Sequence, residues 1–262
     1  MPGFAQLERV PFSLAVDPED RFRLRGSDAP DFLHRLSASE ARDLTARHLL
    51  FTDDKGSLVD APLVVLAEDG FHLIASPGRG PALRAWFEKW IIMDDARVEP
   101  DPQESWRLGE PDLVAGDVIR PETTVGPTVL LGGIAPARVE LAEWEAANFR
   151  AGRLYPGTAT ACGPNPLELG WKDLIAFDKG CYIGQEVIAR MDSYDKVRRR
   201  LATVSLANES PSGAPLSVDG RKRGMVLASV QLEEGWFAWA VLDKSLETGA
   251  ELEDATLISV VE

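Results

Sequence analysis

The segment FDKGCYIGQEVIAR, residues 177–190, holds the residue types and spacing best suited to chemistry. Cysteine reacts as its thiolate, and a nearby cation or helix N-terminus lowers the pKa of the thiol. Lys179 lies two residues before Cys181, and QEVIARM is compatible with a helix that begins after the cysteine. Asp178 and Glu186 act in the opposite direction because a nearby carboxylate favours the protonated thiol. The segment predicts a reactive cysteine, and the alternative of a small buried cysteine in a tight turn stays open.

Gly180 and Gly184 flank the cysteine, and glycine allows backbone conformations and close approaches that a side chain would forbid. The second cysteine, Cys162, lies in the turn-like stretch TACGPNP, for which we predict no chemical role. Two cysteines cannot form a disulfide framework, and they cannot hold a four-cysteine metal site or iron–sulfur cluster unaided.

The composition is typical of a globular protein, with 262 residues, 45% hydrophobic and 27% charged residues. The net charge of −14 makes nucleic acid an improbable partner, since such binders carry basic surfaces. No apolar run approaches the roughly 20 residues of a membrane span, and the N-terminus shows no export signal. We therefore expect no membrane contact, a cytoplasmic location and free thiols.

Other groups of polar residues give weaker indications of a functional site. His34, His48 and His72 show no metal-ligand spacing, so we predict no metal site. KVRRR, residues 196–200, is a basic run that could touch phosphate or begin a solvated strand. Glu168 in PLELGWKDL could accept hydrogen bonds from the N–H groups of a heterocycle, and the alternative is a helix-capping or surface glutamate.

The elements that must position these residues are mixed helices and strands. Ser27 is a candidate N-cap for a helix that continues through Pro30. Asp69-Gly70 lies between two apolar runs, which predicts a β-hairpin. A helix is predicted over residues 81–93 and another near residues 137–150. The apolar residues of the helix at 81–93 recur at i, i+3, i+4 and i+7, which predicts a buried face of Leu83, Trp86, Phe87 and Trp90.

The sequence pattern changes after residue 200, where short apolar runs replace the mixed helical and strand patterns. The runs LATVSL, GMVLASV, WFAWAVL and ATLISVV are separated by turn-rich pieces, which is typical of a small β-barrel or sandwich. We therefore predict an α+β fold, with a body of mixed helices and hairpins in residues 1–194 and a compact all-β module in residues 195–262.

The stretch KGCYIGQE, residues 179–186, resembles the signature Lys-Gly-Cys-[Phe/Tyr]-x-Gly-Gln-Glu of the YgfZ family. These proteins are relatives of the glycine-cleavage T-protein, an aminomethyltransferase, and are linked to iron–sulfur cluster assembly or repair. RGSDAPDFLHRLSASEARDL, PLELGWKDLIAFDKGC and VRRRLATVSL also resemble the family. The resemblance implies a three-lobed ring, with two α+β lobes and a C-terminal barrel around a central hole that binds tetrahydrofolate.

The resemblance also implies roles for individual residues. Cys181 matches the functional cysteine, and Lys179 is its neighbour, so both are predicted as catalytic. Asp60 in GSLVD matches the second aspartate of the T-protein pattern Gly-x-x-Asp-Asp, with Val59 in place of the first. The predicted folate-binding residues are Asp60, Glu168, Tyr182, Gln185 and Arg190.

The chain departs from the family at Asn148 and Leu154, where arginine and proline are common. The resemblance favours a tetrahydrofolate-binding accessory protein for iron–sulfur cluster assembly or repair, whose partners are assembly or client proteins. The alternatives are an aminomethyltransferase that passes a one-carbon unit to tetrahydrofolate, and a non-catalytic RNA- or protein-binding module.

Overall fold

The structure is a computed structural model and describes residues 12–108, 118–119, 128–131, 135–155, 157 and 162–261. The chain divides into two compact units, each assembled from separate stretches. The first unit comprises Met1–Ala29, Asp43–His48 and Pro62–Tyr155. The second unit comprises Pro30–Arg42, Leu49–Ala61 and Pro156–Glu262. The domain boundary predicted at residues 194–195 stays a prediction.

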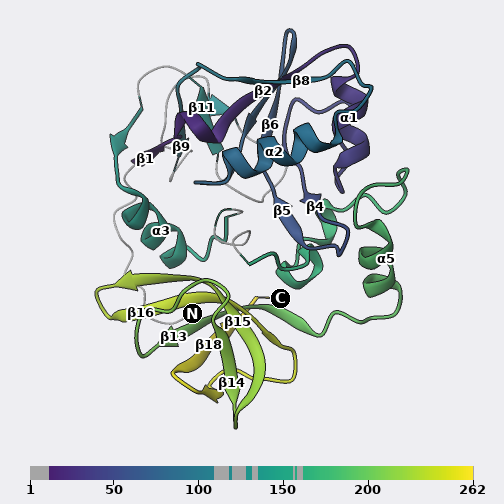
Figure 1. The fold of residues 1–262 in the computed structure, drawn as a ribbon. Coiled ribbons are helices and arrows are strands. Elements are labelled where there is room, and N and C mark those ends of the chain that lie inside the picture. Colours follow the sequence, from purple (N-terminus) through teal and green to yellow (C-terminus); the bar gives the residue numbers. More distant parts are fainter. Residues whose placement is uncertain are drawn as a thin grey trace. The chain divides into compact units, whose positions relative to one another are not determined.

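The first unit contains two five-stranded sheets (Figure 1). One has the order β3-β6-β7-β2-β8 and consists of β3 (Ala46–His48), β6 (Leu63–Ala67), β7 (Gly70–Ile74), β2 (Arg21–Arg25) and β8 (Arg97–Pro100). The other has the order β10-β11-β9-β1-β12 and consists of β10 (Val118–Ile119), β11 (Thr128–Leu131), β9 (Ser105–Leu108), β1 (Phe12–Ala15) and β12 (Ala137–Arg138). Helix α3 (Leu141–Arg150) confirms the helix predicted near residues 137–150.

The sheet that contains β2 and β7 makes apolar contacts on both of its faces. Successive side chains of a strand point to opposite faces, so neighbouring residues contact different partners. On one face Phe22 meets Phe87 of helix α2 (Gly80–Trp90), with ring centroids 5.9 Å apart. On the other face Ile74 belongs to an apolar cluster that includes Val129 of β11. The helix predicted over residues 81–93 is thus confirmed.

The predicted buried face of α2 is only half right. Leu83 and Phe87 are buried, whereas Trp86 and Trp90 are half-buried. The Asp69-Gly70 hairpin is confirmed, since Ala67 and Gly70 are partners in the β6–β7 ladder. Ser27 does not cap the next helix, because its hydroxyl donates to Asp95 Oδ2 at 2.9 Å.

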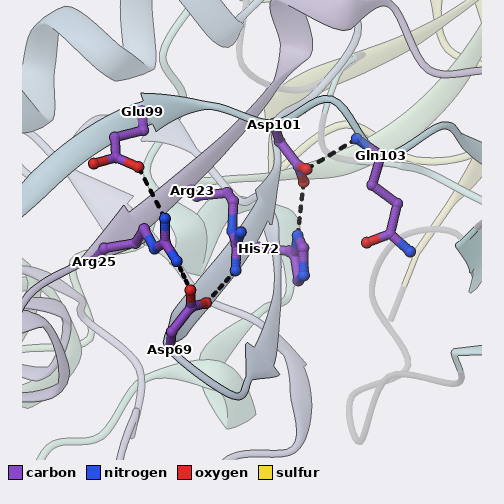
Figure 2. Close-up of polar contacts among 7 residues, drawn as sticks. All are labelled: Arg23, Arg25, Asp69, His72, Glu99, Asp101 and Gln103. Carbon is purple, nitrogen blue, oxygen red and sulfur yellow. Dashed lines mark hydrogen bonds and ion pairs between the residues drawn. The ribbon is translucent and has the colours of Figure 1, made fainter.

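Charged side chains on β2, β7 and β8 form a paired network within the first unit. Figure 2 shows this network, which comprises Arg23, Arg25, Asp69, His72, Glu99, Asp101 and Gln103. The carboxylate of Asp69 pairs with both Arg23 and Arg25, and His72 Nδ1 lies 2.7 Å from Asp101 Oδ2. Burial raises the pKa of Asp101, but the hydrogen bonds from His72 and the Gln103 N–H outweigh it and the pKa is lowered. His72 thus has a structural partner here.

The second unit ends in a six-stranded antiparallel sheet of order β14-β15-β16-β13-β18-β17, drawn in green to yellow in Figure 1. Its strands are β13 (Arg199–Leu206), β14 (Pro215–Val218), β15 (Arg221–Leu232), β16 (Gly235–Asp243), β17 (Glu251–Leu252) and β18 (Ala255–Val260). The two outer strands approach each other, since Glu253 N donates to Ser217 O at 2.9 Å. Val204, Val226, Ala240 and Leu257 are among the residues that fill the interior. The predicted C-terminal barrel is confirmed.

The remainder of the second unit is built from short elements. These are helix α1 (Ala29–Leu36, whose first residue belongs to the first unit), the hairpin of β4 (Phe51–Thr52) and β5 (Leu58–Asp60), the 3-10 turns η3 (Pro166–Leu169) and η4 (Lys172–Leu174), and helix α5 (Gln185–Ser193). Phe32, Leu33 and Leu36 form the buried face of α1, as its spacing predicts. Among the described residues, no helix is both long and apolar enough to span a membrane.

Candidate functional site

Cys181 lies in a turn, residues 177–184, that leads directly into α5; we call it the cysteine turn. The thiol is free and its side chain is exposed, so the alternative of a small buried cysteine is wrong. The helix predicted after the cysteine is present and has Gly184 as its N-cap. Cys181 is therefore an accessible thiol four residues before the first residue of a helix.

The cysteine turn rests on the β4–β5 hairpin. Gly184 has a φ of +85°, and a Cβ at this position would lie 2.4 Å from the carbonyl oxygen of Asp53. Thr52 Oγ1 donates to Ile183 O at 2.6 Å. The backbone freedom predicted for both glycines is thus needed at Gly184 alone. Gly180 is outside the left-handed region, and no heavy atom lies within 4 Å of an added Cβ.

The same hairpin carries Asp60. Its side chain is fully buried, and Oδ1 accepts a hydrogen bond from Ala61 N at 2.8 Å. Asn165 fixes the tip of the hairpin, since its Nδ2 donates to Gly56 O at 2.8 Å, and Leu58 N donates to Pro164 O at 2.9 Å. No sequence pattern indicates the role of Asn165, because its partner is a backbone carbonyl 109 residues away in the chain.

Lys179, predicted as the cation beside the thiol, points its ammonium at backbone oxygens. Nζ donates to the carbonyls of His34, Ser37 and Ser39, the last two at 2.7 and 2.9 Å. Nζ also lies 5.8 Å from the ring centroid of Tyr182. Burial lowers the pKa of Lys179 to about 8, although the nearby carboxylate of Glu40 favours the charged form.

Tyr182 is about nine-tenths buried, and burial raises the pKa of its phenol to about 12. Its hydroxyl has no hydrogen-bond partner among the described residues. A buried polar group without a partner is unfavourable, so this oxygen fits a ligand or an ordered water molecule. Gln185 is half-buried beside it, with its N–H 3.3 Å from Tyr182 O, whereas Arg190 is exposed farther along α5.

Glu168 is buried and its carboxylate is already engaged. Oε1 accepts from Arg199 Nε at 2.7 Å, and Oε2 accepts from Arg199 Nη2 at 3.0 Å and from Asn165 N at 3.2 Å. The capping alternative therefore describes its position in η3. Because a carboxylate has about four acceptor positions, roughly one remains for a ligand.

Two arginines of the KVRRR run are also used internally. Arg199 pairs with Glu168, and Arg200 Nη2 donates to Leu246 O at 2.8 Å. Cys162 is half-buried and its Sγ lies 3.7 Å from Val226 O. Burial raises the pKa of the Cys162 thiol, which favours its protonated form. Among the described residues, no group of three or more His, Cys, Asp and Glu side chains could hold a metal ion.

Several curated relatives match parts of this chain. A chloroplastic protein of Arabidopsis thaliana named as a transferase is 37% identical over 101 residues, which cover 38% of this chain and 23% of that protein. The tRNA-modifying protein YgfZ of Sodalis glossinidius is 33% identical over 122 residues, covering 42% and 36%. A mitochondrial iron–sulfur cluster assembly factor IBA57 homolog of Eremothecium gossypii is 31% identical over 102 residues, covering 37% and 22%. The chain thus spans well under half the length of these relatives, and no family model matches it.

The fold is similar over nearly the whole chain to a solved structure, the glycine cleavage system aminomethyltransferase T from Bartonella henselae. The TM-score is 0.71, the sequence identity is 16%, and the match covers 97% of this chain and 85% of the other. This likeness shows the fold, and it confirms the predicted α+β class with a terminal barrel.

Proposed function

We propose that this chain, which is similar to YgfZ and IBA57 proteins over parts of its length and to the glycine-cleavage T-protein in fold, is an accessory protein of iron–sulfur cluster assembly or repair. It binds tetrahydrofolate and acts through the thiol of Cys181 beside the folate site. The names of two relatives support the iron–sulfur and YgfZ parts of this proposal.

The observation that carries the proposal is the accessible free thiol of Cys181, which lies on a turn that is hydrogen-bonded to the β4–β5 hairpin. A thiolate is the ligand preferred by iron–sulfur clusters, and it is also a nucleophile toward other thiols and reactive adducts. One thiolate cannot hold a cluster alone, so the remaining ligands come from an assembly factor, a client protein or a second copy of the chain. The exposure of Cys181 is what such a shared reaction requires.

Folate binding is supported by polar groups close to the turn. Reduced folate presents ring N–H and carbonyl groups that need partners when buried. The buried carboxylate of Asp60 can accept from a ring N–H, and the hydroxyl of Tyr182, which has no partner in the part of the chain that the structure describes, can complete a further hydrogen bond. Gln185 and Glu168 offer additional polar atoms, and exposed Arg190 offers charge to the carboxylates of the glutamate tail.

The cofactor supplies a one-carbon carrier, whereas the residues of this chain orient it and keep a thiol within reach of a partner. We place this activity in the cytoplasm, where a reducing environment keeps Cys181 as a free thiol. The net charge of −14 disfavours nucleic acid as the partner.

Calorimetric titration with tetrahydrofolate tests the folate part, comparing wild type with Asp60→Ala and Cys181→Ser. We expect Asp60→Ala to weaken binding at least about tenfold, the effect of losing one buried charged hydrogen bond, and Cys181→Ser to leave binding unchanged. Growth of a strain lacking this protein tests the thiol, and Cys181→Ser should fail to restore iron–sulfur enzyme activity. Absence of folate binding by the folded wild type would refute the folate part, and full rescue by Cys181→Ser would refute the role of the thiol.

A second candidate is an aminomethyltransferase. It is favoured by the fold, shared with an aminomethyltransferase over 97% of this chain, and by Asp60, which could orient or deprotonate a folate nitrogen. A turnover assay with aminomethylated carrier protein and tetrahydrofolate separates the two candidates. Turnover abolished by Asp60→Ala but retained by Cys181→Ser would establish the transferase.

A further inference from the structure

The ammonium group of Lys179 has no hydrogen-bond donor left for the thiol. A protonated lysine has three N–H donors. The carbonyls of His34, Ser37 and Ser39 accept one each. A direct hydrogen bond from Lys179 to a Cys181 thiolate would therefore require the release of one carbonyl.

The three carbonyls belong to the end of α1 and the connection that follows it. His34 lies in the last turn of α1, where carbonyls lack partners within the helix and a cation is favourable. Within the connection, Ala38 N donates to Leu50 O at 2.7 Å, and Ala38 O accepts from Ala176 N at 2.9 Å. The connection therefore lies between the start of the hairpin region and the start of the cysteine turn.

We propose that Lys179 is a positioning residue, which ties the end of α1 to the cysteine turn through these three carbonyls and thereby holds Cys181 in its exposed position. The inference rests on the proposed function, because it concerns how that site is built. It replaces the expected role of Lys179 as a direct partner of the thiolate with a role exerted through the backbone of residues 34–39.

The charge of Lys179 is set by the groups around it. Burial lowers its pKa to about 8, the carboxylate of Glu40 raises it, and Arg42 lowers it. The ring of Tyr182 lies on one side, and the side chain of His34 lies 3.0 Å from Glu40. The lowered pKa means that the folded connection binds a proton less readily than an opened one, in which the amine returns to water. Opening of the connection should therefore become less favourable as pH rises from about 8 toward 10.5.

Amide hydrogen exchange and thiol titration of the same variants test this role. The variants are Lys179→Met and the control Lys222→Met, both in a Cys162→Ala background so that Cys181 is the sole thiol. Lys222 is an exposed lysine of β15, so its replacement removes an equal charge from the same unit but outside α1 and the cysteine turn. We expect Lys179→Met to speed exchange of the amides of Ala38 and Ala176 at least about tenfold, and Lys222→Met to leave them unchanged.

The pH profile of Cys181 alkylation separates positioning from direct activation. If Lys179 acts only by positioning, the midpoint of the alkylation pH profile should be the same in the wild type and in both variants. A midpoint raised by a pH unit or more in Lys179→Met, with exchange unchanged, would overturn it. If Lys179→Met fails to fold, the wild type alone decides the question. Protection of Ala38 and Ala176, corrected for intrinsic exchange, should rise between pH 8 and about 9.5, because an opening that returns Lys179 to water becomes less favourable there. Constant protection over this range would overturn the proposal. Neither readout depends on folate or on iron–sulfur activity, so a failure here leaves the proposed function standing.

Discussion

Substitution of Gly184 by alanine should displace the cysteine turn from the β4–β5 hairpin. A residue other than glycine at its φ of +85° costs about 1–2 kcal/mol. The added Cβ would also lie 2.4 Å from Asp53 O and 3.0 Å from Gly56 Cα, both backbone atoms that cannot rotate away. Such overpacking typically costs about 1–3 kcal/mol more. We therefore expect Gly184→Ala to lower the free energy of unfolding by about 2–5 kcal/mol.

Two other glycines of the same unit separate the two contributions. Gly170 has a φ of +76° but nothing within 4 Å of an added Cβ, so Gly170→Ala should cost about 1–2 kcal/mol. Gly180 has neither constraint, so Gly180→Ala should change stability by less than about 0.5 kcal/mol or stabilise slightly.

Urea denaturation followed by tryptophan fluorescence measures the three values, compared as midpoints at a shared slope. The alkylation rate of Cys181 reports the turn itself and should change in Gly184→Ala alone. Equal midpoints for Gly184→Ala and Gly180→Ala would show that the hairpin does not constrain the turn, and the reasoning would fail.

Three further changes test neighbouring contacts. Glu168→Gln breaks the buried pair with half-exposed Arg199 and should lower the free energy of unfolding by about 2–3 kcal/mol in urea melts, more than Arg200→Gln does. Tyr182→Phe removes a hydroxyl that has no partner among the described residues, so the melting temperature should hold or rise while calorimetry shows weaker folate binding. Burial lowers the pKa of Lys179 from its ordinary value of 10.5 to about 8, so between these values the unfolded chain binds more protons than the folded chain. The unfolding free energy of wild type should therefore rise relative to Lys179→Met from pH 8 to 10.5, by at most about 3 kcal/mol; a constant difference would contradict the lowered pKa.

The sequence was sufficient where the signal is local. Asp69-Gly70 specifies its hairpin, and the alternating runs after residue 200 specify the barrel strands, because both patterns arise between neighbours in the chain. The helix after Gly184 follows from the same kind of signal. At Gly180 the residue type alone suggested a backbone requirement that the dihedral angle does not show.

The site itself depends on long-range contacts that the sequence does not display. The acceptors of Lys179 are backbone carbonyls 140 to 145 residues away, and carbonyls leave no mark in a sequence. Proximity in the chain therefore suggested Cys181 as its partner. Trp86 and Trp90 fit a buried helical face by spacing, but what packs against α2 decides how much of that face is covered.

The contact between the cysteine turn and the β4–β5 hairpin has a consequence for the order in which the site forms during synthesis. Thr52 and Ile183, which form the hydrogen bond between hairpin and turn, are 131 residues apart. At a translation rate of about 5–20 residues per second, the hairpin waits roughly 7–26 s on the ribosome before its partner is made. Until then Gly56 O lacks the donor that Asn165 supplies, and Leu58 N lacks the acceptor that Pro164 supplies. The reactive thiol thus reaches its final setting only after residues 164–183 have been made, so a nascent chain stalled before that point carries an incomplete site.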